Sequence, residues 1–133
     1  MFKLLLLLLS VATLFSSSTY YEYGKKVELT PHTQNKSLQL NKQDRNISLR
    51  YYKNKNDRVI GVDNTIIAKC LQQKDCISVI NKYTNLRYKT ISKDTYLISV
   101  DNQEEVFTMS VKLYEEGCFK YAHPNFYRQR ELR

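Results

Sequence analysis

The residues of this chain that could perform nucleophilic or metal chemistry are three cysteines and two histidines among 133 residues. Cys118 and His123 come closest together, but five residues along one strand would place the two side chains on opposite faces. A thiol nucleophile needs its base within hydrogen-bonding reach, so this pair does not suit nucleophilic catalysis. The cysteines and histidines also lack the short ligand spacings of zinc sites. We therefore expect no catalytic residue, no metal and no cofactor.

The cysteines suit a disulfide better than catalysis. Five residues separate Cys70 from Cys76 across an expected turn, so a local bridge is sterically easy. A loop this short would stabilise the fold by less than the roughly 3 kcal/mol of a 15-residue loop. A bridge from Cys70 to Cys118 is the alternative if the last strand starts near the end of the first, and three reduced, buried thiols are another. We favour Cys70–Cys76.

The first 18 residues have the pattern of a secretory signal peptide. Lys3 precedes an apolar run over residues 4–15, and Ser16 and Ser18 place small side chains at positions −3 and −1 of a cut before Thr19. The apolar run is short for a membrane span, although an uncleaved anchor is the alternative. We expect a secreted or periplasmic protein with no membrane partner after cleavage.

The mature chain would have 115 residues, enough for one small domain. It would carry 20 basic and 13 acidic side chains, a net charge of +7, because Lys3 is the only charged residue that cleavage removes. A basic surface suits nucleic acid, an anionic membrane or an acidic partner, or it only keeps the protein soluble. Export argues against nucleic acid as the partner.

Residues 19–57 are expected to form an N-terminal hairpin and a polar linker. The hairpin would run from Tyr20 to Leu29 around a turn at Gly24–Lys25. Residues 32–46 are polar and free of glycine, which is typical of a connection. A strand over Ile47–Lys53 and extended backbone over Arg58–Val62 would follow.

From Thr65 onward, alternating and helical apolar spacings indicate six elements. They are a strand over Thr65–Cys70, a helix capped by Asp75, strands over Leu86–Ile91 and Thr95–Val100, a helix capped by Asn102, and a strand over Cys118–His123. The order β-α-β-β-α-β predicts a ferredoxin-like α+β fold, with a four-stranded antiparallel sheet and both helices on one face. The other face would be open, with apolar side chains pointing to it.

Three segments of this region carry a family resemblance. They are Asn64-Thr65-Ile66-Ile67-Ala68-Lys69, Asp94-Thr95-Tyr96-Leu97-Ile98-Ser99-Val100 and Tyr121-Ala122-His123-Pro124-Asn125-Phe126. Through them, residues 58–128 resemble the N-terminal prodomain of secreted subtilisin-like serine proteases, in particular its fervidolysin-like variant. The resemblance implies a ferredoxin-like propeptide over residues 58–126 that acts as an intramolecular chaperone and temporary inhibitor. Its partner would be the catalytic domain of such a protease, in cis or in trans.

The resemblance also implies how the chain would dock. The open sheet face would pack on two surface helices of the protease, and its candidate docking residues are Ile67, Leu97, Phe119 and Tyr121. We expect Pro124 to end the last strand because it has no N–H, so that the chain beyond it lies in the substrate cleft. The cleft residues would be Pro124, Asn125, Phe126, Tyr127 and Arg128. Residues 127–133 would form the C-terminal tail.

The sequence shows no protease active site. With Gly24, Gly61 and Gly117 as its glycines, the chain has no Gly-Thr-Ser-Met-Ala nucleophile motif, and no Ser-His-Asp triad can be assembled. The chain would then be a prodomain of a longer precursor, a disrupted gene product or a stand-alone secreted inhibitor. An envelope interaction domain without a protease partner is a further alternative. An RNA-recognition module shares the topology, but the strand Tyr96–Val100 lacks the Lys/Arg-Gly-aromatic signature.

We predict that the purified chain has no hydrolytic activity, because the sequence places no nucleophile beside a base. Assays with chromogenic peptide and ester substrates should give the rate of buffer alone. Hydrolysis that disappears when one of the chain's own residues is substituted would contradict this prediction.

Overall fold

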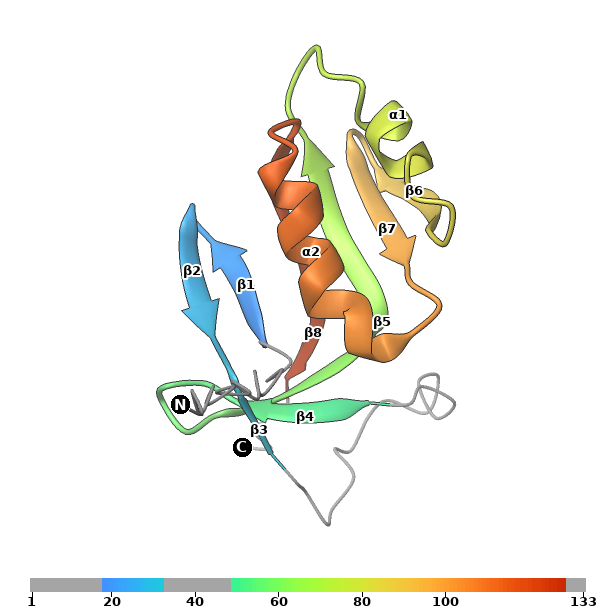
Figure 1. Ribbon diagram of the computed structural model, residues 1–133. Coiled ribbons are helices and arrows are strands. Elements are labelled where there is room, and N and C mark those ends of the chain that lie inside the picture. The colour runs from blue at the N-terminus through green and yellow to red at the C-terminus, as the bar shows by residue number, and fades with distance from the viewer. Residues whose placement is uncertain (1–17, 33–48, 129–133) are drawn as a thin grey trace, which may run out of the picture.

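A computed structural model describes residues 18–32 and 49–128 of the chain (Figure 1). It shows an α+β fold with a mostly antiparallel sheet and two α-helices. The expected signal peptide lies outside the described residues except for Ser18, and so do residues 33–48 of the polar linker and residues 129–133 of the tail. Among the described residues, no helix is long and apolar enough to cross a membrane.

Strand β5, Val59–Cys70, is the centre of the sheet. Strand β8, Phe119–Arg128, pairs with both halves of β5 on one edge. The other edge of β5 pairs first with β4, Arg50–Lys53, and then with β7, Thr95–Ser99. Strand β6, Arg87–Ser92, extends the sheet beyond β7, and the two-residue strand β3, Thr30–Pro31, extends it beyond β4. All of these pairs are antiparallel.

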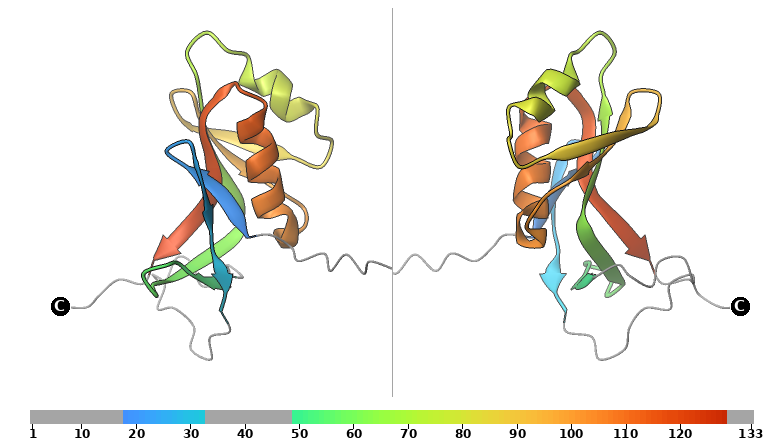
Figure 2. Two further views of the ribbon diagram at one scale, coloured as in Figure 1. Left: turned by 60° about the vertical axis from the view of Figure 1, so that its left-hand side comes forward. Right: turned by 90° about the vertical axis from the view of Figure 1, so that its right-hand side faces the viewer.

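Both helices lie on the same side of this sheet (Figure 2). They are α1, Cys76–Asn81, and α2, Val106–Glu115, which follows a short 3-10 turn at Gln103–Glu105. The predicted cap of α1 is confirmed, because Asp75 Oδ1 accepts the Ser78 N–H at 3.1 Å. The side chains that meet between the helices and the sheet are almost fully buried: Ile66, Ala68, Ile80, Ile98, Val100, Val106, Leu113 and Ala122.

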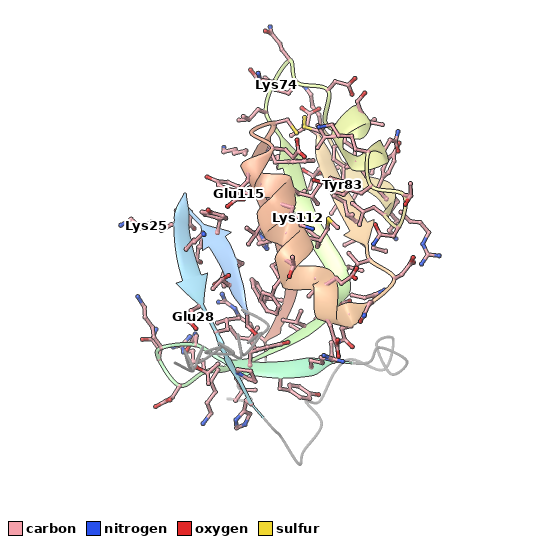
Figure 3. All side chains as sticks on the ribbon, viewed as in Figure 1. Lys25, Glu28, Lys74, Tyr83, Lys112 and Glu115 are labelled. Atoms are coloured by element: carbon pink, nitrogen blue, oxygen red, sulfur yellow. A yellow bond between two sulfur atoms is a disulfide. The ribbon has the colours of Figure 1, made fainter. Side chains whose placement is uncertain are left out.

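The N-terminal hairpin lies beside α2 (Figure 1). Its strands are β1, Thr19–Glu22, and β2, Lys25–Glu28. Tyr21 stacks on Tyr114 of α2 with ring centroids 4.4 Å apart, and its hydroxyl donates to Glu115 Oε1 at 2.9 Å. Figure 3 shows Glu115 on the side of α2 that faces the hairpin. Residues expected to precede the domain therefore pack into its core, where Tyr20 and Leu29 are buried.

The hairpin turn is one residue earlier than predicted. Tyr23 and Gly24 have φ angles of 50° and 76° and connect the pair Glu22–Lys25. A two-residue turn with both φ angles positive matches the twist of antiparallel strands. Gly117 follows the C-cap residue Glu116 of α2 and has a φ of 84°, as expected for the left-handed residue that ends a helix.

The expected strand end at Pro124 is wrong. Pro124 is buried and lies opposite Ile66, and β8 continues to Arg128 opposite Ile60. Proline has the φ of an extended strand, and a residue without an N–H is tolerated at the edge of a sheet or beside a bulge. Both conditions hold, because β8 is an edge strand and its register with β5 shifts between Val62 and Ile66. Strand β5 is also continuous, whereas the sequence predicted two separate extended segments, Arg58–Val62 and Thr65–Cys70.

The favoured disulfide is present. Cys70 and Cys76 are bridged, with their Cα atoms 5.9 Å apart, and Cys118 is a buried free thiol. The Cys118 carbonyl oxygen lies 3.1 Å from Cys76 Sγ, so the third cysteine packs directly beside the bridge. Burial raises the pKa of the Cys118 thiol, which keeps it protonated at neutral pH.

We predict that Ile66→Ala lowers the free energy of unfolding by about 2–5 kcal/mol, because Ile66 is 0% exposed between Ile98 and Pro124. Urea denaturation followed by circular dichroism measures this change. Ile91→Ala is the matched control, since Ile91 is 47% exposed and should change stability by no more than about 0.5 kcal/mol. Equal losses in the two variants would contradict the assignment of the core.

Candidate functional site

The candidate site is the face of the sheet opposite the helices, called the open face below. Strand register places its side chains in rows that run across the sheet. The rows are His123–Ile67–Leu97–Lys89, Tyr121–Lys69 and Thr65–Ser99–Arg87. The alternate residues of β5 point to the helices and are fully buried, whereas Ile67, Lys69, Leu97, Tyr121 and His123 are half-buried. The face is therefore accessible, although it carries apolar and aromatic side chains.

Three of the four candidate docking residues lie on the open face. Ile67 lies between His123 and Leu97, and Tyr121 lies in the next row, opposite Lys69. Phe119 does not lie there, because it is 3% exposed and belongs to the core. The register of β5 and β8 shifts between Lys69 and Cys70, so that Tyr121 lies opposite Lys69 and Phe119 lies opposite Cys70. Because of this shift, Phe119 and Tyr121 point to opposite sides of the sheet.

Aromatic rings follow β8 in a continuous series. Tyr121 stacks on His123 with ring centroids 5.4 Å apart, and His123 stacks on Phe126 at 5.8 Å. Phe126 then meets Tyr20 of the hairpin edge-to-face at 4.8 Å. His123 Nδ1 lies 2.8 Å from the Pro124 carbonyl oxygen, which can only accept, so Nδ1 carries a proton. These contacts hold the rings of the open face in fixed orientations.

Basic side chains border the apolar part of the open face. Lys69, Arg87 and Lys89 lie in its rows. Arg87 also pairs with Asp101 at 3.4 Å, but both side chains are exposed, so this pair contributes little. A shallow hollow of about 320 Å³ lies over β6 and β7, and it is lined by Arg87, Tyr88, Lys89, Leu97 and Ser99. The hollow thus combines an apolar wall with two cations.

A buried carboxylate ties the two halves of the β5–β8 pair together. Asp63 is 6% exposed, and its Oδ1 accepts the N–H and the hydroxyl of Thr65 at 2.8 and 2.6 Å. Its Oδ2 accepts the Tyr127 hydroxyl at 2.9 Å. Asn125 Nδ2 lies 3.3 Å from both the Thr65 and Tyr127 hydroxyl oxygens. These bonds lie where the register of the strands shifts, so they replace ladder bonds that the shift interrupts.

The residues expected to occupy a protease cleft are strand residues. Pro124, Phe126, Tyr127 and Arg128 lie opposite residues of β5, and Asn125 belongs to the Asp63 cluster. Their main chain is held in the sheet up to Arg128. Residues Pro124–Arg128 are therefore not free to enter a cleft while β8 stays paired with β5.

The structure does not bring a nucleophile and a base together at this site. Cys118 is buried in the core, whereas His123 lies on the open face. Within residues 18–32 and 49–128, no group of three or more His, Cys, Asp or Glu side chains could hold a metal ion. The open face thus presents apolar, aromatic and basic side chains.

Sequence reasoning missed the hydrogen-bonded cluster that Asp63 forms with Thr65 and Tyr127. The spacing of Asp63 and Thr65 is a usable signal, because an aspartate often accepts the N–H two residues later. The sequence instead suggested two extended segments, Arg58–Val62 and Thr65–Cys70, with Asp63 between them. Nothing near Tyr127 in the sequence points to a carboxylate 64 residues away.

Comparison with known proteins gives no relative for this chain: no family model, no curated protein and no solved structure matches it.

We predict that Tyr127→Phe lowers the free energy of unfolding by about 1–3 kcal/mol, because it removes a donor from the buried carboxylate of Asp63. Tyr23→Phe makes the same chemical change at a ring that is 98% exposed, and it should alter stability by less than about 0.5 kcal/mol. Chemical denaturation of both variants tests the difference. If Tyr127→Phe is as stable as Tyr23→Phe, the cluster does not hold β8 to β5.

Proposed function

We propose that this chain is a propeptide-like domain that acts as an intramolecular chaperone and temporary inhibitor of a secreted subtilisin-like serine protease. The observation that supports this proposal best is the open face, where Ile67, Leu97 and Tyr121 lie on adjacent strands with their side chains half-buried. A partner that covers these side chains gains roughly 25 cal/mol for each Å² of apolar surface removed from water. The helices leave this face available for such a partner.

We also propose that β5–α1–β6–β7–α2–β8 is a ferredoxin-like unit. The antiparallel pairs β8–β5, β5–β7 and β7–β6 support this topology, and so does the position of both helices on one side. The hairpin β1–β2 and the strands β3 and β4 are additions to the unit. In this arrangement the open face is the natural surface for a protein partner.

In the proposed complex, the open face packs on two surface helices of the catalytic domain. Tyr121 and His123 are the central aromatic contacts, and their stacked rings lose little freedom on binding. Blockade of the protease's substrate cleft is assigned to residues beyond Arg128, because Pro124–Arg128 are held in β8. The Cys70–Cys76 bridge is compatible with export to an oxidising compartment.

The chaperone role follows from the same contact. A preformed face that binds the folded catalytic domain and not its unfolded chain stabilises the folded form by mass action. The rigid sheet is suited to this role, since its central residues Ile66 and Ala68 are fully buried behind the open face.

One observation favours a second candidate, a single-stranded nucleic acid. The stacked rings of Tyr121 and His123 lie beside Lys69, and Lys89 is at the far end of the His123 row. Bases stack on exposed aromatic rings while cations hold the phosphates, so the same face meets the requirements of that partner.

Ile67→Asp tests the proposal, because it places a charge in the centre of the proposed interface. We predict that the inhibition constant for a secreted subtilisin-like protease of the source organism rises at least 30-fold, since an unpaired buried charge costs about 2–5 kcal/mol. Hydrolysis of a chromogenic peptide by the protease measures inhibition. Ile77→Asp is the matched control, because Ile77 is an exposed residue of α1, and it should inhibit as wild type does.

Circular dichroism of both variants confirms that they are folded before inhibition is compared. Wild-type protein that fails to inhibit any such protease, or equal inhibition by the two variants, would refute the protease proposal. In a parallel titration, tight binding of a fluorescent single-stranded RNA that Ile67→Asp abolishes would support the second candidate instead.

A further inference from the structure

Strand β6 is an accessible edge of the sheet. It pairs with β7 on one side, and no other strand of the described residues pairs with it (Figure 1). All six of its residues, Arg87–Ser92, are exposed. An unpaired strand edge presents a row of main-chain donors and acceptors to any extended chain that approaches it.

The opposite edge of the sheet is less accessible. Strand β1 packs beside β8, where Tyr20 covers Phe126 at a centroid distance of 4.8 Å. Strand β3, at the other end of the sheet, has two residues and includes Pro31, so β6 is the edge best able to accept a further strand.

The side chains of β6 favour an acidic strand. Arg87 and Lys89 are two residues apart, so both project to the open-face side, opposite Ser99 and Leu97. The Asp101 carboxylate that pairs with Arg87 is exposed and can be exchanged for another carboxylate at little cost.

The hollow beside these cations has the chemistry of a site for a glutamate side chain. Leu97 offers an apolar wall for methylene groups, and Ser99 offers a hydroxyl for a carboxylate oxygen. Arg87 and Lys89 line the same hollow of about 320 Å³. A side chain with two methylene groups and a terminal carboxylate matches all of these surroundings.

We propose that β6 binds an extended peptide with acidic side chains at alternate positions, which adds a strand to the sheet. Main-chain hydrogen bonds supply affinity, and two carboxylates of the peptide pair with Arg87 and Lys89 to give selectivity. This site goes beyond the function proposed above, because it uses the edge of the sheet and does not need Ile67, Tyr121 or a protease.

A second copy of the chain is a poorer occupant of this edge. Pairing of β6 with β6 would bring Arg87 and Lys89 of one copy next to the same cations of the other. Basic side chains on an edge strand are a common device against such self-pairing. The same charges attract a strand of opposite sign.

The first experiment measures binding of a fluorescein-labelled peptide, Thr-Val-Glu-Val-Glu-Val-Thr, to the full chain by fluorescence anisotropy. We expect Arg87→Glu and Lys89→Glu each to weaken binding at least about tenfold. Lys55→Glu is the matched control, because Lys55 is an exposed residue of the Asn54–Asp57 turn, and it should change affinity less than about twofold. Tyr121→Ala should leave peptide binding unchanged, because Tyr121 is on β8 and strands β5 and β7 lie between it and β6, and this variant separates the site from the proposed protease contact.

Changes in the peptide keep the test valid even if a protein variant does not fold. With wild-type protein, a peptide in which lysines replace the glutamates should not bind measurably. The double variant Arg87→Glu with Lys89→Glu should bind this lysine peptide and not the acidic one. A lysine peptide that binds wild type as well as the acidic peptide does would overturn the proposal.

The second experiment tests main-chain pairing with two peptides that are N-methylated at alternate residues. In a strand, the N–H groups of one alternate set point to the neighbour, so one peptide should lose binding and the other should keep it. Amides of β6 should also exchange hydrogen more slowly in the complex. The proposal fails if both methylated peptides bind, if neither binds, or if a single-stranded oligonucleotide binds the same residues as tightly.

Discussion

Main-chain pairing by β5 is the constraint on which the rest of this structure depends. Strands β4, β7 and β8 all pair with β5, and β3 and β6 join the sheet only through two of these partners. Because β8 occupies one edge throughout, β4 and β7 must share the other edge in succession. The irregularity at residues 63–65 separates these two segments of β5, and the Asp63 carboxylate accepts the Thr65 N–H inside it. Strand β5 is paired on both edges and lies at the centre of the sheet, where its residues Ile66 and Ala68 are fully buried.

Features that depend on neighbouring residues were predictable from the sequence. Asp75 caps α1 through the Ser78 N–H, three residues away, and Gly117 ends α2 with the positive φ that glycine adopts most easily. The Cys70–Cys76 bridge closes a short loop, so its geometry is local as well. The β-α-β-β-α-β order of elements from Thr65 onward also follows from spacing alone, and the α+β class with it.

Features that depend on strand register were not predictable in the same way. Alternation along β8 put Phe119 and Tyr121 on one face, but the shift beside Cys70 sends Phe119 to the core. The rule that proline ends a strand failed at Pro124, because an edge strand beside a bulge does not need the missing N–H. The sequence predicted the hairpin as a segment separate from the domain, yet Tyr21 of the hairpin stacks on Tyr114 of α2. Each of these outcomes is decided by a partner far away along the chain.

The buried free thiol of Cys118 can be used to measure local opening of the fold. It is the single unbridged cysteine of three, and it is buried where the end of α2 meets the start of β8. Its raised pKa and its burial both suppress reaction with an alkylating reagent in the closed protein. The rate of alkylation under native conditions therefore depends on how often this junction opens, just as the rate of amide hydrogen exchange depends on local opening. Opening at the start of β8, which borders the open face, can therefore be measured without introducing a label.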